Sequence, residues 1–217
     1  MTAEMGRALG ALGDGDASVR LRAALAIGTN PHAAAVDPLV ARCAVEPEFS
    51  VREMLTWALT RHDPAATVPR LLPELRSPLA RARSQALHTL SKIGDPRTWP
   101  SITRDLLLDA DDEVARAAWR TAVALVPDGG EHALAEVLTT QFARGSRETR
   151  LSLSRALIGL GEGVLPLLHA AALHPDPAVR AHATATEQLY HDPEAGFTLA
   201  VEEAKRVAVL GPDGAQG

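Results

Sequence analysis

Residues 16–28 read Asp-Ala-Ser-Val-Arg-Leu-Arg-Ala-Ala-Leu-Ala-Ile-Gly, and the same pattern returns along the chain. An acid or turn residue precedes an apolar or small anchor and an arginine, and further small or apolar residues follow four, five and eight positions after the anchor. This spacing puts those side chains on one face of an α-helix. The anchors are Val19, Val51, Ala82, Val114, Thr149 and Val179, separated by 32, 31, 32, 35 and 30 residues. The chain is therefore predicted to contain six copies of one helical unit.

A second series, of prolines among apolar residues, runs in phase with the anchors. It comprises Pro38, Pro69, Pro100 and Pro166, with Ala133 at the matching place in the remaining copy. Proline is tolerated in the first turn of a helix, where its missing amide hydrogen would have no intrahelical partner. Each proline is therefore interpreted as the start of a further helix. Each repeat then has an outer helix (A) and an inner helix (B).

The pattern predicts an all-α chain with short connections. The expected helices span residues 3–12, 18–28, 36–45, 50–61, 67–76, 80–93, 98–108, 113–125, 131–143, 147–160, 164–173, 177–190 and 194–209. Asp16, Asp111, Asp176 and Ser146 stand where a side-chain oxygen can cap the first amides of B helices. Asn30-Pro31, Asp63-Pro64, Asp95-Pro96 and the loop 127–130 are turn signals after B helices.

The run from Asp16 to Gly28 resembles the HEAT repeats of the phycobilin-lyase-like subclass, and the resemblance covers about residues 3–190. It implies an α-solenoid of about six antiparallel hairpins, and a role as scaffold or adaptor. It also implies a ladder in which the repeated arginine pairs with an acid of a neighbouring repeat. The ladder arginines would be Arg20, Arg52, Arg83, Arg150 and Arg180. Ala115 interrupts the ladder in the fourth repeat, where a weaker joint or a change of twist is expected.

A single solenoid domain is predicted over residues 1–210, with a capping helix at 194–209 and a flexible tail at 211–217. The chain has 217 residues, 46% of them hydrophobic, which suffices for a core without metals or disulfides. Its one cysteine indicates a reducing compartment. No signal peptide or membrane-spanning run is recognised, so a cytoplasmic location and no membrane partner are expected. A net charge of −5 argues against a generally basic nucleic-acid binder.

Basic residues gather on one predicted face of the B helices, which line the concave side of such solenoids. This predicted partner-binding ridge comprises Met54, Trp57, Arg61, Gln85, His88, Lys92, Arg116, Arg120 and Arg155. Arginine gives bidentate contacts to carboxylate or phosphate, and tryptophan offers an apolar anchor. The predicted partner is therefore an acidic or phosphorylated protein segment. The alternative interpretation is that these charges are solvated or pair with nearby acids such as Glu53 and Glu113.

Catalytic and cofactor signals are lacking in the sequence. The histidines have no metal-ligand spacing, there is no phosphate-binding loop or nucleophile elbow, and Cys43 fits a buried thiol, so no catalytic, metal or cofactor residue is assigned. Two HEAT-like enzyme classes remain by resemblance of fold alone. One is the alkylpurine DNA glycosylases, which use Trp, Asp and Arg around the lesion; here no acid is placed among the ridge arginines. The other is the phycobilin lyases, whose subunits share the repeat, but no feature of the sequence specifies a tetrapyrrole site. Nucleic-acid binding, with or without glycosylase activity, is the alternative function.

Overall fold

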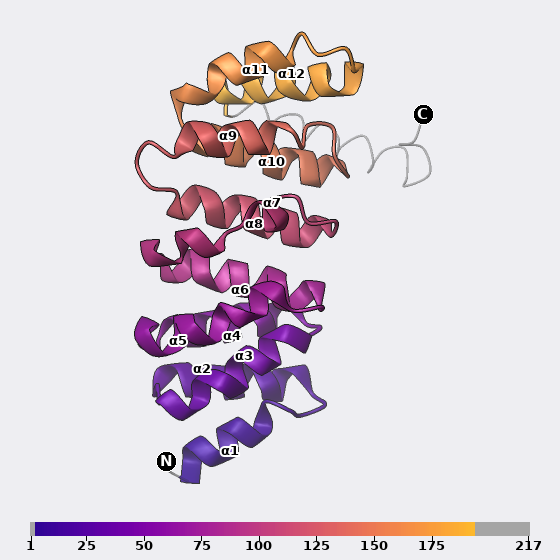
Figure 1. Ribbon diagram of the computed structural model, residues 1–217. Helices are drawn as coiled ribbons and strands as arrows, with labels where there is room; N and C mark the ends of the chain where they lie inside the picture. Colours follow the sequence, from indigo (N-terminus) through magenta and orange to yellow (C-terminus); the bar gives the residue numbers. More distant parts are fainter. Residues whose placement is uncertain (1–2, 194–217) are drawn as a thin grey trace, which may run out of the picture. The chain divides into compact units, whose positions relative to one another are not determined.

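The computed structural model describes residues 3–193, and every regular element in that range is helical (Figure 1). The α-helices are α1 (Ala3–Ala11), α2 (Ala17–Thr29), α3 (Val36–Val45), α4 (Phe49–Thr60), α5 (Pro64–Leu71), α6 (Ala80–Ile93), α7 (Arg104–Leu107), α8 (Asp112–Leu125), α9 (Glu131–Thr139), α10 (Arg147–Gly159), α11 (Leu165–Ala171) and α12 (Pro177–His191). Four 3-10 helices join them: η1 (Ala33–Ala35), η2 (Pro73–Arg76), η3 (Pro96–Ser101) and η4 (Glu162–Val164). The predicted all-α solenoid class is confirmed. The capping helix and tail predicted for 194–217 lie outside the described residues.

The chain divides into two compact units, Met1–Val137 and Leu138–Gly217. The boundary falls within α9, in the stretch where the anchor spacing lengthens to 35 residues. The assignment of residues 1–210 to one domain stays a prediction.

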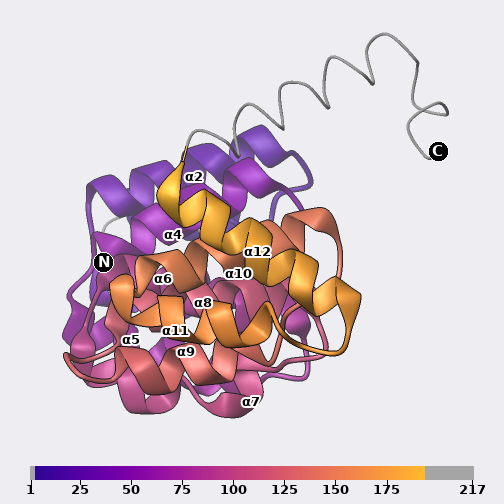
Figure 2. The same cartoon turned by 90° about the horizontal axis from the view of Figure 1, so that it is seen from above.

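Unit 1 is built from two layers of helices. The B helices α2, α4, α6 and α8 form one layer, and α3, α5 and α7 with the 3-10 segments form the other. Figure 2 shows α2 and α4 towards one side of the picture and α5 and α7 towards the other. Contacts are extensive between α2 and α4 and between α6 and α8, and sparser between α4 and α6, where α3 also reaches α6.

The B helices begin and end within two residues of their predicted bounds. The predicted caps are confirmed: Asp16, Asp111, Asp176 and Ser146 each accept a backbone N–H in the first turn of the following helix. The repeated apolar positions of the inner repeats are buried, with Val51, Leu55 and Leu59 of α4 fully inaccessible. The anchors of the first and last repeats, Val19 and Val179, are half-buried. The 3.6-residue period therefore predicted the core of this layer correctly.

Two of the outer segments differ from the prediction. Pro69 lies inside α5, which instead begins at Pro64 after the cap Asp63, and Pro100 lies inside η3, which begins at Pro96 after the cap Asp95. The Asp-Pro pairs were predicted to be turns after B helices, and they also start the A segments. The continuous helix predicted at 98–108 is wrong, because two prolines four residues apart each remove an amide donor. A 3-10 helix and the four-residue α7 take its place.

Unit 2 holds α10, η4, α11 and α12, with α12 packed on both α10 and α11. Leu153, Leu157, Leu168 and Ala183 form its apolar centre. Among the described residues no single helix is long and apolar enough to cross a membrane; the pair Arg147–Gly159 and Glu162–Ala171 passes jointly by length and composition, with a bend of 116°.

Candidate partner-binding face

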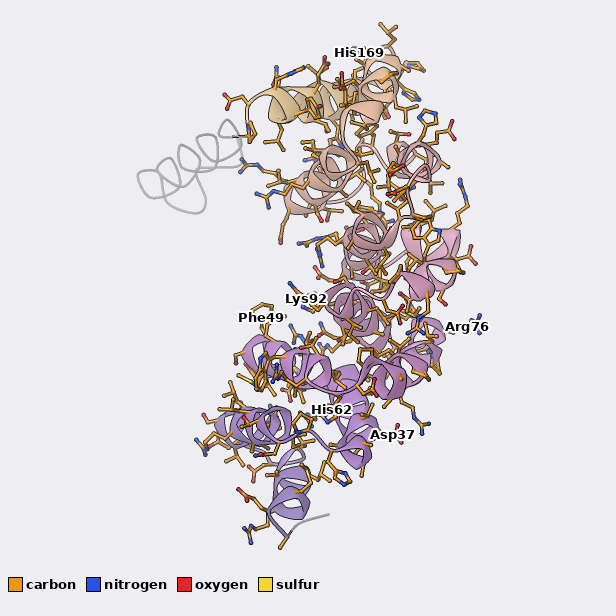
Figure 3. The ribbon with its side chains drawn as sticks, turned by 90° about the vertical axis from the view of Figure 1, so that its left-hand side faces the viewer. Asp37, Phe49, His62, Arg76, Lys92 and His169 are labelled. Carbon is orange, nitrogen blue, oxygen red and sulfur yellow. The ribbon has the colours of Figure 1, made fainter. Side chains whose placement is uncertain are left out.

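The predicted ridge residues of unit 1 lie at the surface of three successive B helices. Met54, Trp57 and Arg61 belong to α4 and its C-terminal cap, Gln85, His88 and Lys92 to α6, and Arg116 and Arg120 to α8; none of the eight is buried. Figure 3 shows Lys92 on the opposite side of unit 1 from Asp37 and Arg76 of the outer layer. Arg155 is exposed on α10 in unit 2.

His88 marks the point where the basic residues of two helices converge. Burial lowers the pKa of its imidazole, the positive charges of Lys92 and Arg120 lower it further, and Glu53 opposes them. His88 Nε2 lies 3.2 Å from Glu53 Oε1. Lys92 and Arg61 are exposed and make no ion pair with any residue between 3 and 193. A neutral imidazole and several cations therefore share this surface.

Two carboxylates also lie on the ridge. Glu53 lies beside His88, and Glu113 Oε1 is 3.0 Å from Arg116 Nη1 on the same helix. The expectation that no acid lies among the ridge residues is therefore wrong. Glu53 lies two positions after the anchor of α4, on the same surface as Met54 and Trp57. The predicted pairing of ridge cations with Glu53 and Glu113 thus occurs at two positions, His88 and Arg116.

The Trp57 side chain packs against α2 and is also partly exposed to solvent. Its ring covers the backbone of Gly28 in α2, since a Cβ built on Gly28 would lie 2.4 Å from Trp57 Cζ3. The side chain nonetheless keeps 38% of its surface exposed. Trp57 therefore joins α4 to α2 and presents an apolar surface beside the basic residues.

Four of the five ladder arginines share one contact, made to their own repeat. In Arg20, Arg52, Arg83 and Arg180, Nη1 donates to the carbonyl groups of the residues six and five positions earlier, at 2.6–3.4 Å. These carbonyls belong to the loop before each B helix. The arginine therefore clamps the loop onto its helix.

Within residues 3–193, pairing with an acid of the next repeat occurs at two ladder positions. Arg20 binds Glu46 through Nε and Nη2 at 2.8 and 2.7 Å, and Arg83 binds Asp109 in the same way at 2.9 and 3.0 Å. Both acids stand five residues before the next anchor, a signal that the sequence analysis missed. At that position Ser77 follows Arg52 and His174 follows Arg150, so neither arginine has an acid there. The ladder predicted from the resemblance is therefore partly wrong.

The fourth repeat, which lacks a ladder arginine, still packs closely on the third. Ala115 is fully buried, and Thr121 Oγ1 donates to Leu87 O of α6 at 2.9 Å. Contacts between α6 and α8 are extensive. No weaker joint is found on this side of the repeat.

Part of the chain is similar in sequence to a known family. Residues 36–124 match the family model described as HEAT repeats. This segment, from α3 to α8, therefore consists of HEAT repeats. No curated protein matches the sequence.

Two solved structures are similar to this chain. The complex of CpcE and CpcF of phycocyanin lyase from Nostoc sp. PCC7120 is 20% identical, with a TM-score of 0.50, covering 86% of this chain and 76% of that chain. An engineered protein is 18% identical with a TM-score of 0.48, covering 88% of this chain and 97% of that chain. The subclass suggested by the resemblance stays a prediction.

Reactive groups on these HEAT repeats are buried or dispersed. Burial raises the pKa of the Cys43 thiol to about 12, so it is a poor nucleophile at neutral pH. No group of three or more His, Cys, Asp or Glu residues within residues 3–193 could hold a metal ion. The surface of the B helices can therefore bind charged and apolar groups.

Proposed function

We propose that this HEAT-repeat protein is a non-catalytic interaction scaffold that binds an acidic or phosphorylated segment of another protein on the B-helix face of unit 1. The observation that carries the proposal is the convergence of Lys92 and Arg120 on His88, with the part-exposed Trp57 on the neighbouring helix α4. Cations supply charge-assisted hydrogen bonds, and a tryptophan edge supplies an apolar anchor. Arg155 lies in unit 2, and the proposal rests on the residues of unit 1.

The two carboxylates of the ridge limit the partners that fit it. Glu53 and Glu113 would repel a continuous row of phosphates, whereas a protein segment can place its acids against the cations alone. A neutral His88 adds no charge at pH 7, so the exposed Arg61 and Lys92 carry the attraction. The proposal therefore favours a protein segment over a nucleic-acid backbone.

Charge reversal at two exposed ridge residues tests the proposal. Arg61→Glu combined with Lys92→Glu should reduce partner capture from extracts of the native cells by about tenfold or more, measured by quantitative mass spectrometry. Arg76→Glu, on the opposite layer, is the matched control and should leave capture unchanged. Equal capture by the double variant and the wild type would exclude the ridge.

Binding of nucleic acid to the ridge is tested separately. Fluorescence anisotropy with labelled duplex and single-stranded DNA would show an affinity that falls steeply with salt if the ridge neutralised phosphates. We expect no retention at low salt. Salt-sensitive binding lost in the double variant would replace the protein-segment proposal with the nucleic-acid one, and a base-excision assay would then test glycosylase activity.

A further inference from the structure

Arg52 differs from two arginines at the same repeat position. Arg20, Arg52 and Arg83 all clamp their own loop through Nη1. Arg20 and Arg83 then direct the Nε–Nη2 edge at a carboxylate of the next repeat. For Arg52 the corresponding residue is Ser77, whose hydroxyl accepts the Leu79 N–H. Within residues 3–193 Arg52 has no carboxylate partner.

A pocket of about 560 Å³ opens at this place, lined by Arg52 and by residues of α3, α6 and α8. It lies at the joint between α4 and α6, where the B helices are in sparser contact than at the neighbouring joints. Arg81 adds a second cation to its wall, and Ala44 and Ala80 are among its small apolar residues. The pocket thus coincides with the ladder position that has no internal acid.

Exposed apolar side chains surround the pocket. Val45 and Leu79 line it with 52% and 51% of their surface exposed. Phe49, 67% exposed, lies under the Arg52 guanidinium, which is 5.7 Å from its ring centroid. Figure 3 shows Phe49 on the same side of unit 1 as Lys92. Three large apolar side chains exposed around one arginine are unusual for a surface that meets only water.

Two other polar side chains of the pocket already have partners, and one polar atom has none. Asp111 caps α8 through the amides of Glu113 and Val114, and Glu113 pairs with Arg116. Gln85 Oε1, in contrast, is buried and has no hydrogen-bond partner. Gln85 lies in the pocket wall, so a bound segment would change the surroundings of its amide.

We infer that the pocket binds an acidic side chain, flanked by apolar residues, from a segment of another protein. The carboxylate would take the Arg52 edge that Glu46 and Asp109 take on Arg20 and Arg83, while the flanking side chains cover Val45, Phe49 and Leu79. Asp111 and Glu113 disfavour a multiply charged phosphate at the same place. This site lies at the N-terminal ends of the B helices and does not depend on the ridge proposal.

A defined peptide probes the site. The probe is acetyl-leucine-glutamate-leucine amide, and its control carries glutamine in place of glutamate. NMR titration of the full chain should show the Arg52 Nε–Hε and Gln85 amide signals shifting with the probe, with at least about tenfold weaker binding of the control. Unperturbed signals at millimolar probe, or equal binding of the two peptides, would overturn the inference.

A variant that keeps Arg52 can be made by placing an acid at position 77, where the neighbouring repeats have Glu46 and Asp109. Ser77→Asp puts a carboxylate where Asp109 stands in the next repeat, so it should occupy Arg52 and abolish binding of the probe. Ser77→Asn, uncharged and of the same shape, should bind the probe as the wild type does. Equal binding by the two variants would contradict the site.

Two further variants test whether a loss of probe binding comes from unfolding or from the ridge. Arg52→Gln should lose the probe, and its thermal melt reports whether the loop clamp was needed for folding. The ridge variant Arg61→Glu with Lys92→Glu should keep the probe affinity. Loss of probe binding in the ridge variant alone would place the probe on the ridge and overturn the pocket assignment.

Discussion

The carboxylate of Glu46 is the most completely bonded charge in unit 1. It is 0% exposed, and it accepts hydrogen bonds from Arg20, from Arg42 and from the backbone N–H of Glu48. Burial alone would raise the pKa of this group, but the hydrogen bonds from the two arginines outweigh it and hold the pKa at about 2. A buried ion pair of this kind is costly to break from one side, because the other charges stay behind without compensation.

We expect Glu46→Gln to destabilise the protein by about 3 kcal/mol, measured by urea unfolding at pH 7. The wild type should lose this contribution on acidification, because the folded pKa lies below the ordinary value of 4.5. The stabilisation is therefore complete above about pH 4.5 and fades as the pH falls towards 2. Arg70→Gln, which breaks the exposed pair with Asp37, is the control and should have no measurable effect. A Glu46→Gln variant as stable as this control would contradict the prediction.

His182 in unit 2 is a buried neutral imidazole. Its Nδ1 accepts the N–H of Ala143 at 3.0 Å, and its Nε2 lies 3.0 Å from Arg150 O and 3.1 Å from Ser154 Oγ. Ala143 has a φ of 66°, a left-handed conformation that is uncommon for alanine. The imidazole thus holds a loop in a costly conformation, and it needs an unprotonated Nδ1 to do so.

Protonation of His182 should destabilise unit 2. Burial lowers the pKa of His182 below its ordinary value of 6.5, so the folded state binds the proton more weakly than the unfolded state. The stability is present above about pH 6.5 and is lost as the pH falls, by up to about 1.4 kcal/mol per pH unit. His182→Gln should flatten the pH dependence of unfolding between about pH 7 and pH 5. His191→Gln, at an exposed position, should leave it unchanged; an unaltered slope in His182→Gln would refute the assignment.

At the scale of elements, small and polar residues decide how closely successive B helices approach. Gly28 of α2 leaves room for the Trp57 ring of α4. Buried hydroxyl groups link other pairs: Thr56 with Thr89 at 3.4 Å, and Ser154 with Thr186 at 2.8 Å. In each hydroxyl pair a residue five positions after one anchor meets a threonine seven positions after the next. These contacts set the register of neighbouring repeats.

Gly28→Ala should destabilise unit 1 by about 1–3 kcal/mol, because the new methyl group would overlap Trp57 and lie 2.8 Å from the Ala58 Cα. Combining it with Trp57→Ala should recover part of this cost in a double-mutant cycle measured by urea unfolding. Gly6→Ala in α1, where nothing lies within 4 Å, is the control and should be neutral or stabilising. Additive effects of the two changes would show that Gly28 and Trp57 are not coupled.

At the scale of the whole molecule, repeats contact mainly their neighbours, so stability is close to a sum of local terms. The division into two compact units agrees with this picture. The strongest ion pairs found, Arg20 with Glu46 and Arg83 with Asp109, both lie in unit 1. Damage to one repeat should therefore spread to its neighbours before it reaches distant ones.

We expect Val51→Asp, which buries an unpaired charge at a fully inaccessible position, to destabilise the protein by several kcal/mol. Hydrogen exchange should show lost protection first in α2, α4 and α6, with α10 and α12 protected for longer. Ser50→Asp, at the neighbouring exposed position, should change little. Simultaneous loss of protection in every helix would show that the two units unfold as one.

Much of this architecture could be predicted from the sequence, because the apolar period and the helix caps are local properties. The B helices, the buried anchors of the four inner repeats and the caps Asp16, Asp111, Asp176 and Ser146 were predicted correctly. The A segments were less predictable, because a proline fits either the first turn or a short 3-10 stretch, and packing selects between them.

The sequence by itself determined the repeat, its helical class and the surface position of the unit 1 ridge residues, since each follows from spacing along one chain. Only the tertiary structure decided which arginine meets which acid, where Trp57 packs, and that Glu53 lies beside His88. These contacts join residues about 26–35 positions apart, and their geometry depends on how one repeat seats on the next. The pocket at Arg52 has the same origin, because Ser77 becomes significant only once the neighbouring repeats are seen to place an acid there.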